Sequence, residues 1–275
     1  MSISVLMSVY RSEKPAYLER ALVSIWDDQI LRPDEIILVK DGPLTEELDV
    51  VINNWEEKLK DKLTVITNPV NEGLTKSLNR GLKKVHGDYI ARMDTDDISM
   101  PERFKLQADF LDRHRDIDII GGWLREFNEE SGELNVRKYP GEPSQIRDYI
   151  SKASPLAHPT VMMRRKIFDN GLAYDERYRT SQDLALWFDA LCAGYNIGNI
   201  PQVTLGFRRD DCVFKRRSKS KANNELKIYL NGIYRLHGLM TWRYIYPLAR
   251  WLFRMMPVSM IKYIYGAGIR TKILK

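Results

Sequence analysis

Three aspartates stand close together in this sequence, directly after a short apolar run that predicts a buried strand. They are Asp94, Asp96 and Asp97, and the apolar run spans residues 89–93. Two unit charges about 4 Å apart near a protein surface repel each other by about 4 kcal/mol at an effective dielectric constant of about 20. A divalent cation would relieve this repulsion, and carboxylate oxygens suit Mg²⁺ or Mn²⁺. The alternative is that the acids only cap the turn before a helix that starts at Pro101, since proline suits the first helical position.

The segments before the acids alternate between strand and helix patterns. Nearly continuous apolar runs, as expected for strands buried on both faces of a sheet, lie at residues 3–9, 35–41, 63–67 and 89–93. Helical patterns follow the first three runs, after Pro15, at residues 45–60 and at residues 71–82. This alternation predicts right-handed βαβ units and a mostly parallel, Rossmann-like sheet flanked by helices, which is an α/β fold.

Polar groups follow three of these predicted strands. Ligands of open α/β sheets bind beyond the carboxyl ends of the strands, so Ser8 and Tyr10, Asp41 and the acids at 94–97 should lie along one edge. Capping alone does not explain polar groups at the ends of three separate strands. The chain has no G-x-G-x-x-G turn and no Walker-type loop. A nucleotide bound here would therefore depend on a metal and on side chains.

The middle of the chain is less regular. It predicts strands at residues 118–124, 158–165 and 203–209 and a short helix at residues 143–153. A further helix is predicted from Ser181, a candidate N-terminal cap, to Leu191. Asp183 falls in its first turn, where the helix dipole favours an anion. His158 could contact a phosphate or have a structural role.

The net charge of +6 conceals an uneven distribution. Residues 208–275 contain 16 Lys and Arg against 3 Asp and Glu, a net charge of +13, whereas residues 1–207 have a net charge of −7. A basic segment of this kind suggests an anionic partner, either a membrane surface or a nucleic acid. A nucleic-acid-binding protein would leave the acidic cluster unexplained, because those acids would repel phosphates.

The basic segment also shows an amphipathic pattern that is rich in aromatic residues. Helical spacing places Arg243, Arg250 and Arg254 on one face, and it places Leu248, Trp251, Leu252 and Met255 on another. Basic and aromatic residues on an amphipathic helix suit the membrane interface, with the arginines near anionic lipid. The alternative is a helix packed on the body with its arginines in solvent.

The cysteine content and the N-terminal sequence indicate in which cellular compartment the protein is expected. Two cysteines, Cys192 and Cys212, offer neither a disulfide framework nor zinc spacing, so a reducing compartment is expected. The N-terminus enters a strand pattern without a basic leader, so no signal peptide is expected. No apolar run reaches about 18 residues, so no membrane-spanning helix is expected.

Several stretches resemble glycosyltransferase family 2, and they occur in the order typical of that family over roughly residues 2–210. These stretches are Ser-Val-Leu-Met-Ser-Val-Tyr at 4–10, Lys-Asp-Gly-Pro at 40–43, Asn-Glu-Gly-Leu-Thr-Lys-Ser-Leu-Asn at 71–79, Arg-Met-Asp-Thr-Asp-Asp at 92–97 and Gln-Asp-Leu-Ala-Leu-Trp at 182–187. The resemblance implies an inverting enzyme of GT-A fold, like those that build bacterial capsule, exopolysaccharide and O-antigen chains.

The resemblance also implies roles for the nucleotide-binding residues. Ser8 and Tyr10 would lie against the base, with Tyr10 stacking on it, and Asp41 would hydrogen-bond the uracil ring. Lys76 falls where the family often has a basic residue near the nucleotide. Thr95, inside the acidic cluster, would also lie against the nucleotide.

The remaining implied roles concern the metal and the reaction. Asp94 and Asp96 match the family's D-x-D motif, with Asp96 as the direct ligand of Mn²⁺ or Mg²⁺ and Asp94 nearer the ribose. Asp183 matches the general base, although this chain has Gln182 where the family usually has Glu. The departure at Gln182 puts in doubt any acceptor contact made by that Glu.

The resulting interpretation is a UDP-sugar-dependent hexosyltransferase with two parts. Residues 1–214 would form the GT-A domain, with a nucleotide-binding half at 1–98 and an acceptor half at 99–214. Residues 215–275 would form a basic helical segment that docks on the inner face of the cell membrane, near a glycan or lipid-linked acceptor. Removal of this segment after about residue 217 is predicted to leave a body that still binds UDP.

Two other classes stay open at this point. One is a metal-dependent nucleotidyltransferase acting on sugar phosphates, although the expected glycine-rich and basic phosphate loop is absent. The other is a non-enzymatic protein that binds an anionic surface. Release of UDP from UDP-sugars would distinguish the three.

Overall fold

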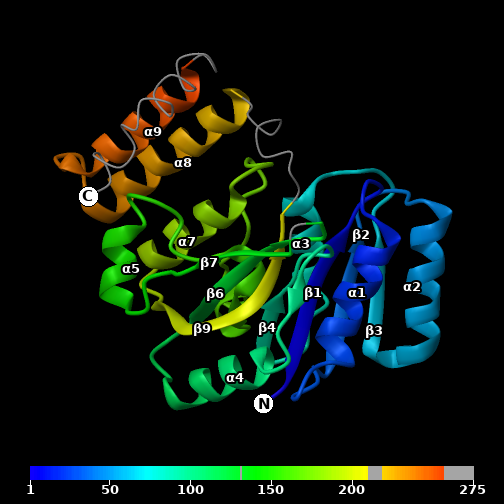
Figure 1. Ribbon diagram of the computed structural model, residues 1–275. Helices are drawn as coiled ribbons and strands as arrows, with labels where there is room; N and C mark the ends of the chain where they lie inside the picture. The colour runs from blue at the N-terminus through cyan, green and yellow to red at the C-terminus, as the bar shows by residue number, and fades with distance from the viewer. Residues whose placement is uncertain (131, 210–218, 257–275) are drawn as a thin grey trace.

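The protein is represented by a computed structural model that describes residues 1–130, 132–209 and 219–256. Within these residues, nine strands form one mixed sheet with helices on both faces (Figure 1). The strands follow the spatial order β3-β2-β1-β4-β8-β6-β9-β5, and β7 pairs with β6. The predicted α/β fold is therefore confirmed.

The strands and helices have the following bounds. The strands are β1 (Ile3–Val9), β2 (Glu35–Lys40), β3 (Leu63–Thr67), β4 (Tyr89–Arg92), β5 (Ile98–Ser99), β6 (Ile119–Asn128), β7 (Gly132–Arg137), β8 (Met162–Arg164) and β9 (Ile197–Arg208). The helices are α1 (Pro15–Trp26), α2 (Glu46–Leu59), α3 (Leu74–Leu82), α4 (Arg103–Arg113), α5 (Pro143–Tyr149), α6 (Lys166–Asp169), α7 (Gln182–Cys192), α8 (Lys219–His237) and α9 (Ile245–Met255).

The first four strands form the parallel part of the sheet. β1 pairs in parallel with β2 on one side and with β4 on the other, and β2 pairs in parallel with β3. In this register Val9 lies opposite Lys40, and Leu6 lies opposite Arg92. The carboxyl ends of β1, β2 and β4 therefore meet at one edge of the sheet, and the residues that follow them converge there.

The second half of the sheet is mixed. β8 is antiparallel to both β4 and β6, while β6 and β9 are parallel. The strand expected at residues 158–165 begins instead with a 3-10 turn over His158–Thr160. Pro159 has no N–H to donate to a ladder, which explains the shorter strand. The helix expected from Pro101 begins at Arg103. A turn precedes it, in which the backbone N–H of Arg103 donates to the carbonyl oxygen of Met100 at 3.1 Å.

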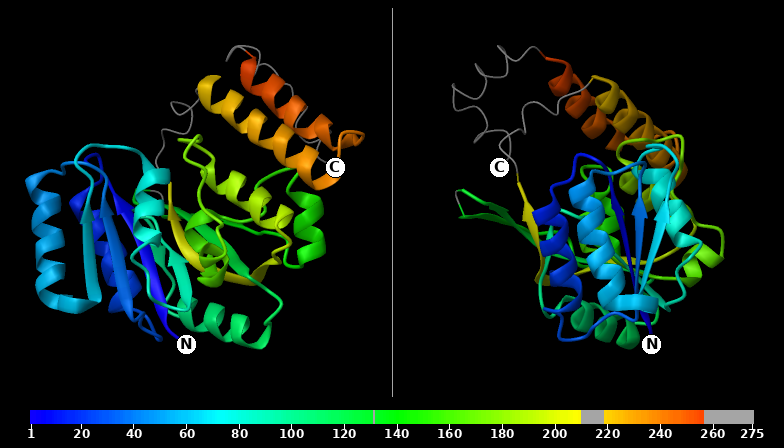
Figure 2. Two further views of the ribbon diagram at one scale, coloured as in Figure 1. Left: turned by 180° about the vertical axis from the view of Figure 1, so that it is seen from behind. Right: turned by 90° about the vertical axis from the view of Figure 1, so that its right-hand side faces the viewer.

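Each face of the sheet has its own apolar core. One core joins the sheet to α1, α2 and α4, and it contains alternate residues of β1 such as Val5 and Met7. The other core contains Leu6 and joins the opposite face to α3, α5 and α7. The alternation follows from the period of two in a strand. Figure 2 shows the helices on the two sides of the sheet.

Helix α8 packs on α7 and completes the second core. Ile228, Tyr229 and Ile233 of α8 are almost fully buried in that core. Gly232 lets the two helices approach closely, because a Cβ atom at this position would lie 2.3 Å from the ring of Phe188 on α7. The ring of Phe188 also meets the ring of Tyr229 edge to face. α9 then lies beside α8 (Figures 1 and 2).

The arginines of α9 do not form the outward face that the sequence suggested. Arg250 and Arg254 both form ion pairs with Glu225 of α8. Arg243, just before α9, pairs with Asp148 at 2.6 Å. Glu225 is only 9% exposed, and a buried carboxylate needs partners, so the arginines turn inward. The outward face of α9 instead contains Leu248 and Leu252.

Some expectations fall on other parts of the chain. Outside the described residues lie Cys212, residues 215–218 at the start of the basic segment, and the aromatic residues Tyr263 and Tyr265. Among the residues that the structure describes, no helix is long and apolar enough to cross a membrane.

Candidate functional site

An open cleft of about 600 Å³ lies at the edge of the sheet where β1, β2 and β4 end. This volume falls in the range of about 300–1,000 Å³ that is common for small-molecule sites. Of the candidate site residues, the cleft brings together Ser8, Tyr10, Asp41, Asp94, Thr95 and Asp96. Its other lining residues are Ser12, Glu13, Lys14, Tyr17, Asn71, Gly73, Leu74 and Phe207.

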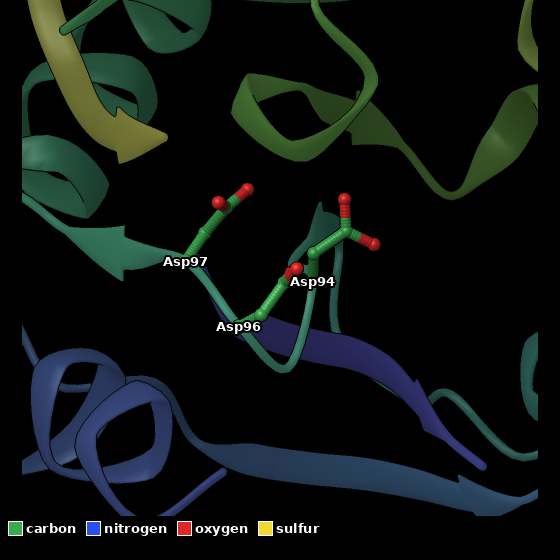
Figure 3. Close-up of side chains that lie close together, drawn as sticks. All are labelled: Asp94, Asp96 and Asp97. Atoms are coloured by element: carbon green, nitrogen blue, oxygen red, sulfur yellow. The ribbon is translucent and has the colours of Figure 1, made fainter. Parts of the chain in front are cut away.

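The acidic cluster lies in the loop between β4 and β5 (Figure 3). One carboxylate oxygen from each of Asp94, Asp96 and Asp97 lies within 4.8 Å of the others. Asp97 is almost fully buried, and its Oδ2 atom has no hydrogen-bond partner among the described residues. A buried carboxylate oxygen without a partner is costly, and a cation bound to the cluster would satisfy it. The cluster therefore fits a divalent metal ion.

Arg208, the last residue of β9, holds the loop of the acidic cluster in place. The backbone N–H of Arg208 donates to Asp97 Oδ1 at 2.9 Å, and Arg208 Nε donates to the carbonyl oxygen of Asp96 at 2.7 Å. The guanidinium group of Arg208 also stacks on the ring of Tyr17, 3.8 Å from its centroid. The loop is thus positioned by a strand more than 100 residues away in the sequence.

Arg92 is a buried partner of the cluster that the sequence analysis did not identify. It is the last residue of β4 and forms an ion pair with Asp94. Burial opposes the charge on Arg92, but the charge and hydrogen bond of Asp94 raise its pKa above the ordinary value. An arginine inside the apolar run Tyr89-Ile-Ala-Arg-Met was the available signal, since a buried cation needs an anionic partner.

The carboxyl groups of Asp96 and Asp97 hold their protons more strongly than free aspartates do. Burial, followed by the charges of Asp94 and Glu13, raises the pKa of Asp96 to about 7. Burial, followed by the charges of Asp94 and Asp96, raises the pKa of Asp97 well above its ordinary value. Like charges and burial both disfavour the ionised form. A cation would act in the opposite direction and would favour ionisation.

A second part of the cleft lining is built around Asp41. Its Oδ1 atom accepts hydrogen bonds from the backbone N–H of Glu72 at 2.9 Å and from Asn68 Nδ2 at 3.1 Å. Its Oδ2 atom accepts a bond from the backbone N–H of Gly73 at 2.9 Å. Gly73 has a φ of 93°, which favours glycine at this turn before α3. Asp41 therefore shapes the loop as well as lining the cleft.

The turn after β1 supplies the third part of the lining. Tyr10 is 49% exposed, so its ring is accessible to a planar ligand. Glu13 is a further residue that the sequence analysis missed, and its Oε2 atom accepts a hydrogen bond from Thr95 Oγ1 at 2.7 Å. This bond joins the turn after β1 to the acidic loop.

Two candidate residues lie outside the lining of this cleft. Lys76, on α3, forms an ion pair with Glu72 at 3.4 Å. Asp183, in the first turn of α7, has a pKa raised by burial, while the backbone N–H of Leu184 and the charges of Arg92 and Lys221 act to lower it. Arg92 thus acts electrostatically on both Asp94 and Asp183.

The start of α7 has an unusual backbone. Ser181 occupies the cap position with φ 60° and ψ 26°, in the left-handed region, and its side chain makes no capping hydrogen bond. Ser181 therefore occupies the predicted N-cap position, but its side chain does not make the hydrogen bond that usually accompanies a serine there. The left-handed region costs a non-glycine residue roughly 1–2 kcal/mol. Such strain often accompanies a functional position, and here it directly precedes Gln182 and Asp183.

His158 is buried in the second core. Its Nε2 atom lies 2.7 Å from the hydroxyl oxygen of Tyr174, and its ring meets that of Trp187 edge to face. Burial, followed by the charge of Arg92, lowers the pKa of His158 well below its ordinary value. A neutral histidine with these partners fits the structural interpretation better than phosphate binding.

The chain is similar to known glycosyltransferases. The model of glycosyl transferase family 2 matches residues 4–172, more than half of the chain. The amylovoran biosynthesis glycosyltransferase AmsE of Erwinia amylovora is 34% identical over 95% of this chain and 97% of its own length. The UDP-Gal:alpha-D-GlcNAc-diphosphoundecaprenol beta-1,3-galactosyltransferase of Escherichia coli is 34% identical over 97% of this chain and 96% of its own length.

Solved structures of S. aureus TarS share the fold. The structure of TarS residues 1–349 with UDP-GlcNAc has a TM-score of 0.65 and 18% identity, and the match covers 93% of this chain and 82% of that chain. A longer TarS structure matches with a TM-score of 0.64, and the match covers 43% of that chain. At this identity the match reports the fold.

Proposed function

Since the chain belongs to glycosyl transferase family 2, we propose that it transfers a hexose from a UDP-sugar to a hydroxyl group of a glycan acceptor, with inversion at the anomeric carbon. Family membership favours this reaction over the nucleotidyltransferase and over the non-enzymatic surface-binding protein. The product would belong to a bacterial surface polysaccharide, as the printed name of the relative from Erwinia amylovora suggests for that relative.

The observation that carries this proposal is that the acidic cluster and the predicted nucleotide-contacting residues line one cleft. Asp94, Thr95 and Asp96 line it together with Ser8, Tyr10 and Asp41. In the proposal Ser8 and Tyr10 contact the uracil base, and the ring of Tyr10 stacks on it. Asp41 Oδ2 has remaining capacity to accept a hydrogen bond from the uracil ring, since a carboxylate oxygen accepts more than one bond. Lys76 would lie nearer the phosphates only if its pairing with Glu72 opened.

Asp94 and Asp96 would hold Mn²⁺ or Mg²⁺, with Asp96 as the direct ligand and Asp94 nearer the ribose. The unpartnered Oδ2 atom of Asp97 supports a cation at this cluster. When bound, the ion would act as a Lewis acid that neutralises the charge developing on the leaving diphosphate. Arg92 would keep Asp94 in place through their ion pair.

Asp183 would accept the proton of the acceptor hydroxyl as that hydroxyl attacks. An alcohol has a pKa far above 7, so a positioned carboxylate is needed to take its proton during the attack. The first turn of α7 places the anion at the positive end of the helix dipole. The raised pKa of Asp183 makes it a stronger base than an exposed aspartate.

We further propose a lipid-linked acceptor at the inner face of the cell membrane. The related Escherichia coli enzyme is named for an acceptor on diphosphoundecaprenol and for a UDP-Gal donor. The donor sugar of this chain would therefore be a hexose carried by UDP. The membrane surface would be reached through the helices that follow residue 218.

The test is release of UDP from a panel of UDP-hexoses, with Mn²⁺, with Mg²⁺ and with EDTA, in the presence of membrane extract as the acceptor source. We expect turnover with one donor, its loss in EDTA, and its loss in Asp96→Ala. The matched control is Asp61→Ala, which removes an exposed aspartate from the turn after α2. Full turnover by Asp96→Ala in EDTA would contradict the metal role, and the absence of turnover with every UDP-hexose would contradict the donor class.

A further inference from the structure

The outer surface of the α8–α9 hairpin exposes a series of large apolar side chains. They come from the turn between the helices and from the outward side of α9: Leu239 (74% exposed), Met240 (98%), Trp242 (65%), Ile245 (62%), Leu248 (42%) and Leu252 (57%). We call these six residues the α9 face. Ile245, Leu248 and Leu252 recur at helical spacing, so they share one side of α9. Single exposed apolar side chains are common on protein surfaces, but six large ones within one hairpin are not, which makes this face a candidate interaction surface.

The polar groups of the hairpin are directed away from this face. Arg250 and Arg254 pair with Glu225, and Trp251 Nε1 donates to Asn223 Oδ1 at 2.7 Å, so these residues of α9 turn toward α8. Arg243 pairs with Asp148. The apolar character of the α9 face therefore results from a defined packing, in which Arg250 and Arg254 pair with α8 and Arg243 pairs with the body, while the leucines stay exposed.

We propose that the α9 face is a docking surface for an anionic phospholipid bilayer. The inference deepens the membrane location given above but does not depend on the transfer chemistry. The α9 face would lie in the lipid interface with α9 parallel to the membrane plane. This differs from the arrangement suggested by the sequence, in which the arginines faced the lipid.

Charge complementarity favours a bilayer over other occupants. Residues 219–256 contain seven Lys and Arg and only one acid, Glu225. The four arginines form ion pairs with Asp148, Asp189 and Glu225, so the charge available to a membrane comes from the three lysines. Lys219, Lys221 and Lys227 of α8 are exposed. Each basic residue near an anionic membrane contributes about 1 kcal/mol of attraction. A protein partner would need an acidic surface of similar extent, whereas a lipid surface supplies negative charge beside apolar chains.

The size of the α9 face also favours a bilayer over a second copy of the chain. The 11 residues of α9 give a helix about 16 Å long and about 10 Å wide, which is a strip of roughly 160 Å². A stable protein interface buries about 800 Å² on each partner. Even with the preceding turn, the α9 face falls well short of that area. A lipid surface requires no such minimum, since each inserted side chain contributes separately.

The position of the hairpin gives this docking a consequence for the reaction. Phe188 on α7 packs on Gly232 and Tyr229 of α8, and Arg235 of α8 pairs with Asp189 of α7. The helix that carries Asp183 is therefore joined directly to the hairpin. Docking through the α9 face would hold Asp183 at a constant distance from the lipid head groups.

The experiment measures binding of the full chain to vesicles of phosphatidylglycerol and phosphatidylcholine by flotation. The variant Ile245→Gln/Leu252→Gln removes two side chains of the α9 face. The matched control is Ile30→Gln/Val50→Gln, which changes residues 63% and 56% exposed on the other half of the molecule. We expect the α9 variant to bind about 100-fold more weakly, at about tenfold for each side chain, and the control to bind as the wild type does.

Three further readouts decide between this inference and its competitors. Binding should weaken with salt and should be weaker on pure phosphatidylcholine, because the charge contribution is screened. Sedimentation velocity tests a dimer, and thermal unfolding tests whether residues 257–275 cover the α9 face. Three results would each overturn the proposal. The first is that the wild type does not bind vesicles, and the second is that it forms a dimer that the α9 variant does not form. The third is that the α9 variant has a lower melting temperature than the control. If all variants release UDP equally in the absence of vesicles, the transfer reaction is intact. A loss of vesicle binding then cannot be due to failure of the proposed function.

Discussion

Arg92 and the three aspartates act as one electrostatic unit. Without a cation, the Arg92–Asp94 ion pair offsets part of the repulsion, and the raised pKa values of Asp96 and Asp97 offset more of it. The unit is therefore compatible with folding in the absence of a metal. It can also bind a metal ion, since a divalent cation can displace the protons held by the carboxyl groups of Asp96 and Asp97.

Metal affinity should depend steeply on pH near neutrality. Because the pKa of Asp96 is about 7, a bound metal must displace its proton at lower pH. We expect the affinity for Mn²⁺ to fall by up to about tenfold per pH unit below about pH 7, measured by isothermal titration calorimetry. Constant affinity between about pH 6 and about pH 8 would contradict this account. Asp96→Asn is the control, and it should bind Mn²⁺ weakly at both pH values.

The same shift has a defined sign for stability. Asp96 keeps its proton in the folded state at pH values where the unfolded chain, with the ordinary value of 3.8, has lost it. The folded state therefore binds more protons between about pH 4 and about pH 7, and the metal-free protein should lose stability as the pH rises through this window. Urea unfolding in EDTA at a series of pH values measures the free energy of unfolding. Asp96→Asn should reduce the slope of this free energy against pH.

Asp183→Asn distinguishes a general base from a helix-capping residue. Asparagine stabilises a helix N-terminus about as well as aspartate, so the free energy of unfolding and UDP binding should change little. The transfer rate should fall about 10²–10⁴-fold if Asp183 takes the acceptor proton. Asp189→Asn, on the same helix, makes the same chemical change at an ion pair with Arg235 and should retain transfer. Near-normal transfer by Asp183→Asn would leave only the capping role.

At the scale of elements, the site depends on contacts between strand ends and helices that are distant in sequence. β9 holds the acidic loop through Arg208, and the turn after β1 holds it through the bond between Thr95 and Glu13. α7 carries Asp183 and is held in turn by α8. A change in the packing of α8 on α7 should therefore be transmitted to the position of Asp183.

Gly232 is the position where this packing is most demanding. A Cβ atom there would lie 2.3 Å from the ring of Phe188, so Gly232→Ala should destabilise the protein by about 1–3 kcal/mol, although alanine favours a helix by up to about 1 kcal/mol. Urea unfolding measures the loss. Asn231→Ala, at the exposed neighbouring position, is the matched control. Phe188→Leu in the Gly232→Ala background should recover part of the loss, because it removes the overlapping ring.

At the scale of the whole molecule, the hairpin belongs partly to the body. The sequence suggested that residues after about 217 could be removed without loss of UDP binding. In the structure Ile228, Tyr229 and Ile233 of α8 are at most 3% exposed and lie in the same core as Phe188. Removal of α8 would expose this core, whereas removal of α9 would mainly uncover Glu225 and remove its two arginine partners.

Two truncations separate these contributions. A chain that ends at residue 209 should bind a hydrophobic dye and unfold at lower urea concentration, because it exposes the α7 surface. A chain that ends at residue 238 and carries Glu225→Gln, so that no buried carboxylate is left without its arginines, should stay folded and bind UDP but should not float with vesicles. If the chain ending at 209 were as stable as the full chain, the packing of α8 would be unimportant for the body.

The sequence by itself determined the α/β fold, the four parallel strands and the placement of Ser8, Tyr10, Asp41 and the acidic loop at one edge. This was possible because apolar periodicity reveals buried strands, and because the carboxyl ends of parallel strands meet at one edge. These features depend on residues that are near in sequence and on a general rule of topology.

Only the tertiary structure decided which groups complete the site and which way the last helices face. The pairing of Arg92 with Asp94, the hold of Arg208 on the acidic loop and the left-handed backbone of Ser181 all depend on contacts between distant segments. Periodicity assigned Arg250 and Leu252 to different sides of α9 but could not say which side meets the body. The structure shows that the arginine side meets α8, where both arginines pair with the buried carboxylate of Glu225, which would be costly to leave unpaired.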